Sequence, residues 1–203
     1  MTDRVRFRPF TGDADTRISL ANAPLELVLC QVRWPELQVL QGDIDEQARA
    51  FGSQLVGLPL YEKTREMGFM ITPEGIQQVD GGSVHTWRSL DCVWNVTLSP
   101  RHVSVYCTRY PGFEEFITRL ENAVESVATH LNVPVVDRVG MRYVNRVANQ
   151  EFITDLEKYV KSAALGFAGF TSESGAARPV NVINQARFET ENLVLQVRSG
   201  VLS

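Results

Sequence analysis

The sequence predicts an α+β domain, in which an antiparallel or mixed sheet of six or more strands carries about three helices on one side. Three observations lead to this prediction. Apolar residues alternate with polar ones in several short segments, they recur at helical spacing in three others, and turn-forming residues separate the segments. The chain has 203 residues, 44% of them hydrophobic, which is enough for a substantial core. We expect a polar arm over residues 1–22 and a single domain over residues 23–203.

The first predicted strand and the first predicted helix follow the arm. Apolar side chains occupy both faces of residues 25–34, as is typical of a central strand. Apolar side chains recur at helical spacing in residues 43–56, and Asp43 is the expected N-cap. A strand that is covered on both faces and a helix that is apolar on one side together require a layered fold.

Antiparallel strands are predicted next. We expect two short strands around a turn at residues 73–75, and then a strand followed by a hairpin that turns at residues 99–101. Period-two alternation places one set of side chains of this hairpin on one face: Leu90, Cys92, Trp94, Val96, Leu98, Val103, Val105 and Cys107.

The rest of the chain adds two helices and three strands. Residues 112–132 have the clearest helical pattern, with one apolar stripe and one acidic side. A strand over 137–147 and a helix over 151–165 follow, and two strands separated near Glu191 and Asn192 end the chain. The core is expected to contain residues from all of these elements: Trp94, Val96, Val105, Phe116, Leu120, Val139, Met141 and Leu156.

A short pattern occurs twice in the sequence. Arg33–Trp34 precedes the first helix in the same way as Arg142–Tyr143 precedes the third, and strands follow in both cases. This repeat predicts two related halves, over about 23–132 and 133–203, that share one sheet around a pseudo-twofold axis. The two arginine-bearing strands would then be neighbours. A chance similarity between short amphipathic segments is an equally weighted alternative.

The strand over 137–147 carries three arginines at steps of four, Arg138, Arg142 and Arg146. A step of four keeps side chains on one face of a strand, so the arginines share a face with Gly140 and Val144. The opposite face, which we expect to join the core, is apolar: Val139, Met141 and Tyr143.

Arg33 and Arg142 form the candidate site, together with Arg138, Arg146 and Tyr143 as candidate binding or pairing residues. A guanidinium in apolar surroundings must be paired, because an unpaired buried charge costs several kcal/mol. We therefore expect Arg33 and Arg142 within roughly 10 Å of each other, where acids, carbonyls or a bound anion pair them. In the alternative interpretation Arg138 and Arg146 are solvated strand residues that pair with a nearby acid: Asp137, Glu121 or Glu125.

Three segments of the sequence resemble the landmarks of a known family: NAPLELVLCQVRWP, VYCTRYPGFEEF and VGMRYVNRV. The family is a sporadically distributed group of prokaryotic proteins without an established activity. Its opening strand begins A-P-L-x-E and ends in R-aromatic-P, and a later strand reads G-L-R-Y-x-N. The matching positions here are Ala23, Pro24, Leu25, Arg33, Trp34, Pro35, Tyr110, Phe113, Phe116, Gly140, Arg142, Tyr143 and Asn145, with Met141 where the family often has Leu.

The resemblance covers residues 23 to about 198, and its motifs are specific to the family and not to any chemistry. It implies an accessory role, such as a defence or toxin-neutralising module. It also implies that this chain is short at its C-terminus, because members of the family continue beyond the last strand.

No catalytic, cofactor or metal site is expected from the sequence, although catalysis is not disproved. The histidines stand apart from one another and form no metal-binding motif: His85, His102 and His130. Glycine-containing turns match neither the phosphate-binding nor the dinucleotide-binding pattern, and no serine lies in a nucleophile motif. The three cysteines lie in apolar runs, where they are expected to be buried thiols in a reducing cytosol: Cys30, Cys92 and Cys107.

The net charge of −4 and the acidic helices disfavour nucleic acid as a partner, and no apolar run is long enough for a membrane span. A cytoplasmic location is expected, since the N-terminal residues lack the apolar core of a signal peptide. The first functional interpretation is a non-catalytic interaction protein, in which a protein partner or a second copy in a homodimer covers an open sheet edge. The second is a protein that binds a small phosphate or carboxylate ligand in an arginine-lined cleft.

Overall fold

The computed structural model describes residues 23–72, 75–149, 152–153, 155–166 and 181–201. The chain divides into two compact units. The larger unit is Pro24–Arg146, and the smaller one combines Met1–Ala23 with Val147–Ser203. The polar arm predicted for residues 1–22 lies outside the described residues.

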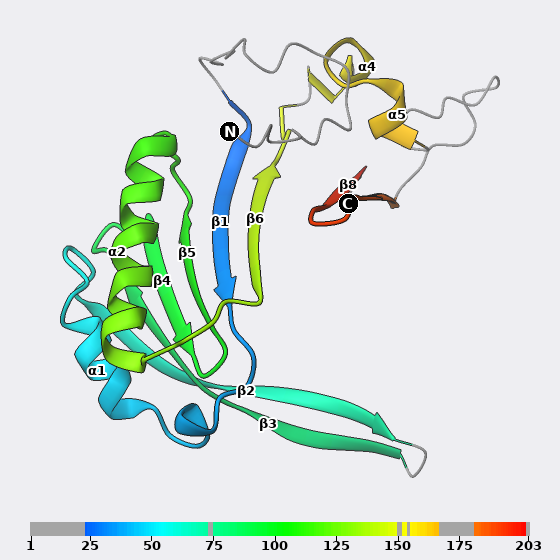
Figure 1. Ribbon diagram of the computed structural model, residues 1–203. Coiled ribbons are helices and arrows are strands. Elements are labelled where there is room, and N and C mark those ends of the chain that lie inside the picture. The colour runs from blue at the N-terminus through cyan, green and yellow to red at the C-terminus, as the bar shows by residue number, and fades with distance from the viewer. Residues whose placement is uncertain (1–22, 73–74, 150–151, 154, 167–180, 202–203) are drawn as a thin grey trace, which may run out of the picture. The chain divides into compact units, whose positions relative to one another are not determined.

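The larger unit is built on one six-stranded sheet in which every neighbouring pair of strands is antiparallel (Figure 1). The strand order is β2-β3-β4-β5-β1-β6, so β1 is an inner strand and β6 lies at one end. The predicted α+β class with at least six strands is therefore confirmed. The strands are β1 Leu25–Arg33, β2 Leu60–Thr72, β3 Gly75–Arg88, β4 Trp94–Ser99, β5 His102–Cys107 and β6 Arg138–Asn145.

Two helices, α1 (Asp45–Gly52) and α2 (Phe113–Leu131), lie on the same face of this sheet (Figure 1). The apolar stripe of α2 explains its position, since its stripe is buried while Glu114 and Glu125 on the other side are exposed. The start of α1 differs from the prediction by one residue. Ile44 is the N-cap, and Asp43 accepts a hydrogen bond of 3.0 Å from the backbone N–H of Asp45.

The core lies between these helices and the sheet, and it contains most of the predicted residues. Trp94, Val96, Val105 and Phe116 are buried, and Leu120 packs partly buried against them. The alternation in β4 and β5 produces this result, because the inward side chains of both strands meet the same helices. The inward set also includes Leu98, Val103 and Cys107.

Two predicted core residues on β6 are exposed. Val139 is 64% and Met141 39% exposed, although their cross-strand partners Val32 and Cys30 are buried. The predicted face is right, because cross-strand partners share a face of the sheet. The predicted burial is wrong. β6 is the last strand in the order, and α2 packs on β5, two strands away.

Leu90 and Cys92 also differ from the prediction. They precede β4 instead of extending it, and both are exposed. The backbone of Cys92 has φ 55°, in the left-handed region, which ends the alternation before Trp94. Cys92 is therefore an exposed thiol, whereas Cys30 and Cys107 are buried as expected.

We expect one of the three thiols to react quickly with an excess of a chromogenic disulfide reagent in the native protein. Cys92 is exposed, while burial raises the pKa of Cys30 and raises that of Cys107 to about 11. The measurement is the absorbance of the released thiolate before and after unfolding in urea. Three equally fast thiols in the native state would contradict the burial of Cys30 and Cys107.

The predicted short strands around residues 73–75 are parts of two long ones. β2 and β3 form a ribbon that extends away from the rest of the sheet (Figure 1), and β4 pairs only with His85–Arg88 of β3. The glycines that suggested a break are a bulge: Glu66 pairs with Gly82 and Met67 with Asp80, so Gly81 is the extra residue.

The smaller unit contains an antiparallel hairpin of β7 (Val182–Glu189) and β8 (Val194–Val201), which confirms the predicted separation near residues 191–192. The single helix predicted for 151–165 is wrong. Residues 152–153 are helical, and residues 155–166 contain two further short helices, α4 (Leu156–Tyr159) and α5 (Ser162–Leu165), with Val160 extended between them.

Hydrogen bonds to the β7–β8 hairpin explain why α5 is a separate helix and does not continue α4. The side-chain amide of Asn184 donates a hydrogen bond of 2.8 Å to the carbonyl of Leu165. The hydroxyl of Ser199 likewise donates to the carbonyl of Ala164. Leu156, a predicted core residue, belongs to the smaller unit and is only half-buried.

Candidate functional site

β6 presents Arg138 and Arg142 on the face of the sheet opposite the helices, and Arg146 directly follows the last residue of the strand. Arg142 lies across from Leu29 and Arg138 from Arg33, while the alternate residues of β1 point into the core. Gly140 shares this face with the arginines, as predicted. The end position of β6 follows from the strand order, so within Pro24–Arg146 its outer edge pairs with no described strand.

The three arginines differ in their partners. Arg146 forms an ion pair with Glu26 at 3.3 Å, and Arg138 donates a hydrogen bond of 3.4 Å to the side chain of Gln31. Arg142 is exposed and has neither an ion pair nor a hydrogen bond among the described residues. These partners are not the acids that the sequence suggested. The exposure itself agrees with a solvated face.

The predicted proximity of Arg33 and Arg142 is wrong. The two residues are four register positions apart on neighbouring strands, which puts their backbones about 14 Å apart. Arg33 is instead directly opposite Arg138 on β6 and opposite His102 on β5. Because Arg142 is exposed, no desolvation cost forces it to be paired.

The two arginine-bearing strands are nevertheless neighbours, as the repeat predicted. The antiparallel register is compatible with that repeat. If Arg33 corresponds to Arg142, then Gln31 corresponds to Gly140. Gln31 and Gly140 are in fact cross-strand partners between β1 and β6. A pseudo-twofold axis would pass through this pair and would leave corresponding side chains on the same face.

The other face of β6 carries the exposed apolar side chains. Tyr143 is half-exposed, and its ring makes an edge-on contact with Tyr110 at 6.5 Å between centroids. Partial burial raises the pKa of both phenols. The Tyr143 hydroxyl donates a hydrogen bond of 3.4 Å to the sulfur of Met141. β6 therefore combines a cationic face with an apolar one at the same sheet edge.

A second cluster, which the sequence interpretation missed, lies at the start of α1. The ammonium of Lys63 on β2 is 2.5 Å from a carboxylate oxygen of Asp45 and 3.4 Å from one of Asp43. The Nε2 atom of His85 on β3 is 3.6 Å from the same oxygen of Asp45. One potential ligand atom from each of Asp43, Asp45 and His85 lies within 4.8 Å of the others. We call Asp43, Asp45, Lys63 and His85 the Asp45 cluster.

The His85 side chain is fully buried in this cluster. Its Nδ1 atom hydrogen bonds to the hydroxyl of Tyr61 at 2.9 Å, while Nε2 has no hydrogen-bond partner among the described residues. Burial lowers the pKa of His85, and the opposing attraction of Asp45 does not overcome this effect. The hydrogen bond from Lys63 lowers the pKa of Asp45. The cluster thus places a buried imidazole beside two partly exposed carboxylates.

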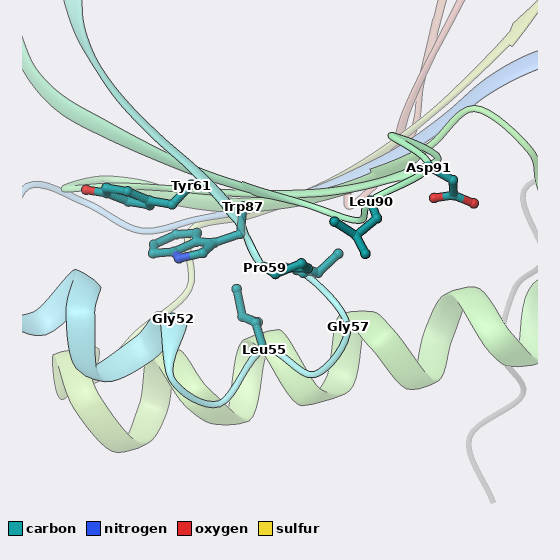
Figure 2. A pocket seen from close by; sticks show the side chains of 9 residues that line it. Gly52, Leu55, Gly57, Pro59, Tyr61, Trp87, Leu90 and Asp91 are labelled. Carbon is teal, nitrogen blue, oxygen red and sulfur yellow. The ribbon is translucent and has the colours of Figure 1, made fainter.

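Aromatic rings connect His85 to a neighbouring pocket. His85 stacks on Trp87 at 6.1 Å between centroids, and Trp87 contacts Tyr61 and Phe51 at 5.6 and 5.2 Å. Tyr61 and Trp87 also form part of the wall of a pocket of about 670 Å³ (Figure 2). The rest of the wall comes from the end of α1, the loop after it and the turn before β4: Gly52, Leu55, Gly57, Leu58, Pro59, Leu90 and Asp91.

The one charged residue of the pocket wall, Asp91, is already engaged. Its carboxylate accepts hydrogen bonds from the Ser89 hydroxyl at 2.6 Å and from the Val93 backbone at 3.1 Å. These bonds, that of Ser89 above all, lower the pKa of Asp91. The pocket therefore offers mainly apolar surface, and the polar chemistry of this region belongs to the Asp45 cluster.

The sequence interpretation missed the cluster because its members come from four separate places: the loop before α1, the first residue of α1, β2 and β3. Asp43 was read only as a helix cap and His85 only as an isolated histidine. One signal was available. His85 alternates with Ser83 and Trp87 on β3, and this period places all three on the buried face.

Comparisons with models of protein families, with curated proteins and with solved structures find no match to this chain. The family resemblance of the sequence therefore stays a prediction. Among the helices of the described residues, none has the length and apolar character needed to cross a bilayer.

Proposed function

We propose that this protein is a non-catalytic interaction protein, and that the outer edge of β6 accepts an extended segment of a protein partner. One observation carries the proposal. β6 ends the strand order of the larger unit, with exposed arginines on one face and exposed apolar side chains on the other. The free edge of β6 and the side chains on its two faces would together bind one extended segment of the partner.

The backbone supplies the first part of the interaction. An edge strand has N–H and C=O groups that no neighbour satisfies, and an added strand satisfies them with main-chain hydrogen bonds. β5 shows the same kind of pairing on the far side of β1, where six residues pair in antiparallel register. A segment of about six residues would be enough to cover most of β6.

The side chains of β6 specify the chemistry of the partner. A strand beside β6 would place alternate side chains against the arginines Arg138 and Arg142, where carboxylates can form bidentate hydrogen bonds. Its other side chains would meet the exposed residues Val139, Met141 and Tyr143 and would bury their apolar surface. The expected partner segment therefore alternates acidic and apolar residues.

The same charges argue against a second copy of this chain at β6. In an antiparallel β6–β6 pair related by a twofold axis normal to the sheet, both sets of arginines would lie on one face. Like charges directly opposite each other destabilise a strand pair. A homodimer thus fits this edge less well than an acidic partner.

The family resemblance is consistent with a partner protein, since it implies a defence or toxin-neutralising module. On this proposal the partner would be the toxin or effector that supplies the acidic segment. The alternative of a small-anion protein has less support. Its central requirement was an arginine pair on one ligand, and Arg33 and Arg142 are four register positions apart.

Replacement of Arg142 by Glu should weaken binding of an alternating peptide such as a Glu-Val repeat of about eight residues. We expect a loss of about tenfold or more, because the substitution turns an attraction for carboxylates into repulsion. Fluorescence anisotropy of the labelled peptide measures the affinity. The same peptide should bind the unmodified protein more weakly as salt is raised.

Two controls separate strand addition from general charge attraction. Arg49→Glu on the exposed side of α1 makes the same charge change away from β6 and should leave binding intact. A peptide with all Glu residues before all Val residues has the same composition without the alternation and should not bind. Equal affinities of the two peptides, or equal losses in the two variants, would exclude the proposed edge.

A further inference from the structure

We propose that Asp43, Asp45 and His85 bind a divalent transition-metal ion, which takes the place of the Lys63 ammonium in the Asp45 cluster. The site is distinct from the β6 edge and involves none of its residues. The ion would connect the start of α1 to β3. No part of this inference depends on the proposed partner.

The buried imidazole of His85 is the first argument. A polar atom that is withdrawn from water without a partner costs free energy, and His85 Nε2 is such an atom. Nδ1 is held by the hydroxyl of Tyr61, and when its proton points at that oxygen the lone pair of Nε2 faces the carboxylates. Metal-bound histidines are commonly oriented by such a bond at the other ring nitrogen.

The position of Lys63 is the second argument. Its ammonium already lies between the two carboxylates, 2.5 Å from Asp45 and 3.4 Å from Asp43, so this point in the fold attracts a cation. Lys63 is a monovalent cation on a flexible stem with about a third of its side chain exposed. It can move into solvent, which leaves its place to a divalent ion that His85 also coordinates.

The donor set indicates which ions fit. Two carboxylates and one neutral imidazole suit zinc or manganese, whereas magnesium and calcium prefer oxygen ligands alone. Asp43 is 61% and Asp45 45% exposed, so water can complete the coordination shell. Zinc is the most informative probe because imidazole nitrogen is one of its usual ligands.

Zinc titration of the full-length protein against a chromophoric chelator tests the site. Every sample carries Cys92→Ser, because the exposed thiol would otherwise bind zinc itself. We expect one zinc ion to bind this protein, and Asp45→Asn to weaken the affinity by about tenfold or more. Lys63→Met should strengthen it by about tenfold, since a competing cation is removed.

Tyr61→Phe adds a readout that does not alter any ligand. It removes the hydroxyl that orients His85 and should weaken zinc binding by about 10-fold to 100-fold. The unfolding curve of each variant is first measured without metal, to confirm that the variant folds. Asp45→Asn is chosen because asparagine has nearly the same size as aspartate. Zinc binding by Lys63→Met alone overturns the proposal, because Lys63 would then be the permanent cation. No binding in the Cys92→Ser protein, or equal affinity in all variants, overturns it as well.

Discussion

Replacement of Phe116 by Ala should lower the free energy of unfolding by about 3–5 kcal/mol, the usual cost of removing a fully buried aromatic side chain. Phe116 on α2 is completely buried, and its ring contacts those of Trp94 and Tyr110, each at 6.0 Å between centroids. The cavity would lie at the centre of the contact between α2 and the sheet. Urea unfolding followed by tryptophan fluorescence measures the difference.

Met141→Ala is the matched substitution on β6. The sequence placed both residues in the core, but Met141 is 39% exposed at the sheet edge, so we expect a loss below about 1 kcal/mol. Similar losses in the two variants would mean that β6 is covered in solution. A bound strand or a second copy would then have to supply the cover, and light scattering would detect the second copy.

Local periodicity was sufficient to predict which faces of the strands point inward. Val96 and Val105 are buried because the side chains of a strand alternate, and this rule needs no knowledge of the neighbours. Burial on β6 could not be predicted in the same way. Val139 and Met141 point to the helix side as expected, yet exposure depends on the position of the strand in the sheet.

The sequence alone could not distinguish a glycine in a β-bulge from a glycine in a turn. Glycine-containing segments predicted turns, but β3 continues through Gly81 and Gly82 with a bulge, and Gly82 has φ 90°. A bulge and a turn both need a residue that tolerates positive φ. The pairing partner Glu66 distinguishes them, and it lies 16 positions earlier in the chain, as the pair Glu66–Gly82 shows.

The arginines of β6 could be predicted in part from the sequence, whereas the Asp45 cluster could not. The arginines of β6 belong to one segment, so their common face was predictable, whereas the distance from Arg142 to Arg33 depends on the register between strands. The Asp45 cluster joins residues of a loop, α1, β2 and β3. Its geometry depends on the pairing of Lys63 with His85 across the β2–β3 ribbon. Register is a tertiary property, and a single sequence constrains it only weakly.

The strand order also connects the exposed residues with the proposed function. In an inner strand the apolar face of β6 would be buried in the core, but at the end of the sheet it is exposed surface that a partner can bury. The arginines on the opposite face limit which partner can do so. The same position in the sheet thus explains the failed core prediction and the proposed interaction.

Replacement of Gly52 by Ala should destabilise the protein by about 1–3 kcal/mol through overpacking. Gly52 ends α1 beside the indole of Trp87, and a Cβ atom there would lie 2.5 Å from Nε1 of that ring. Trp87 is buried between Phe51, Tyr61 and His85, so the ring cannot move away without disturbing the aromatic contacts. A change in native tryptophan fluorescence should accompany the loss.

Gly140→Ala on β6 is the control for this substitution. A Cβ atom at Gly140 would meet nothing within 4 Å, and its φ is not positive. The change should therefore leave stability unaltered or raise it by up to about 1 kcal/mol, because alanine restricts the unfolded chain more than glycine does. Thermal unfolding of the two variants gives the comparison. If Gly52→Ala melted at the same temperature as Gly140→Ala, the close packing of α1 against Trp87 would be wrong, and with it the wall shared by the pocket and the Asp45 cluster.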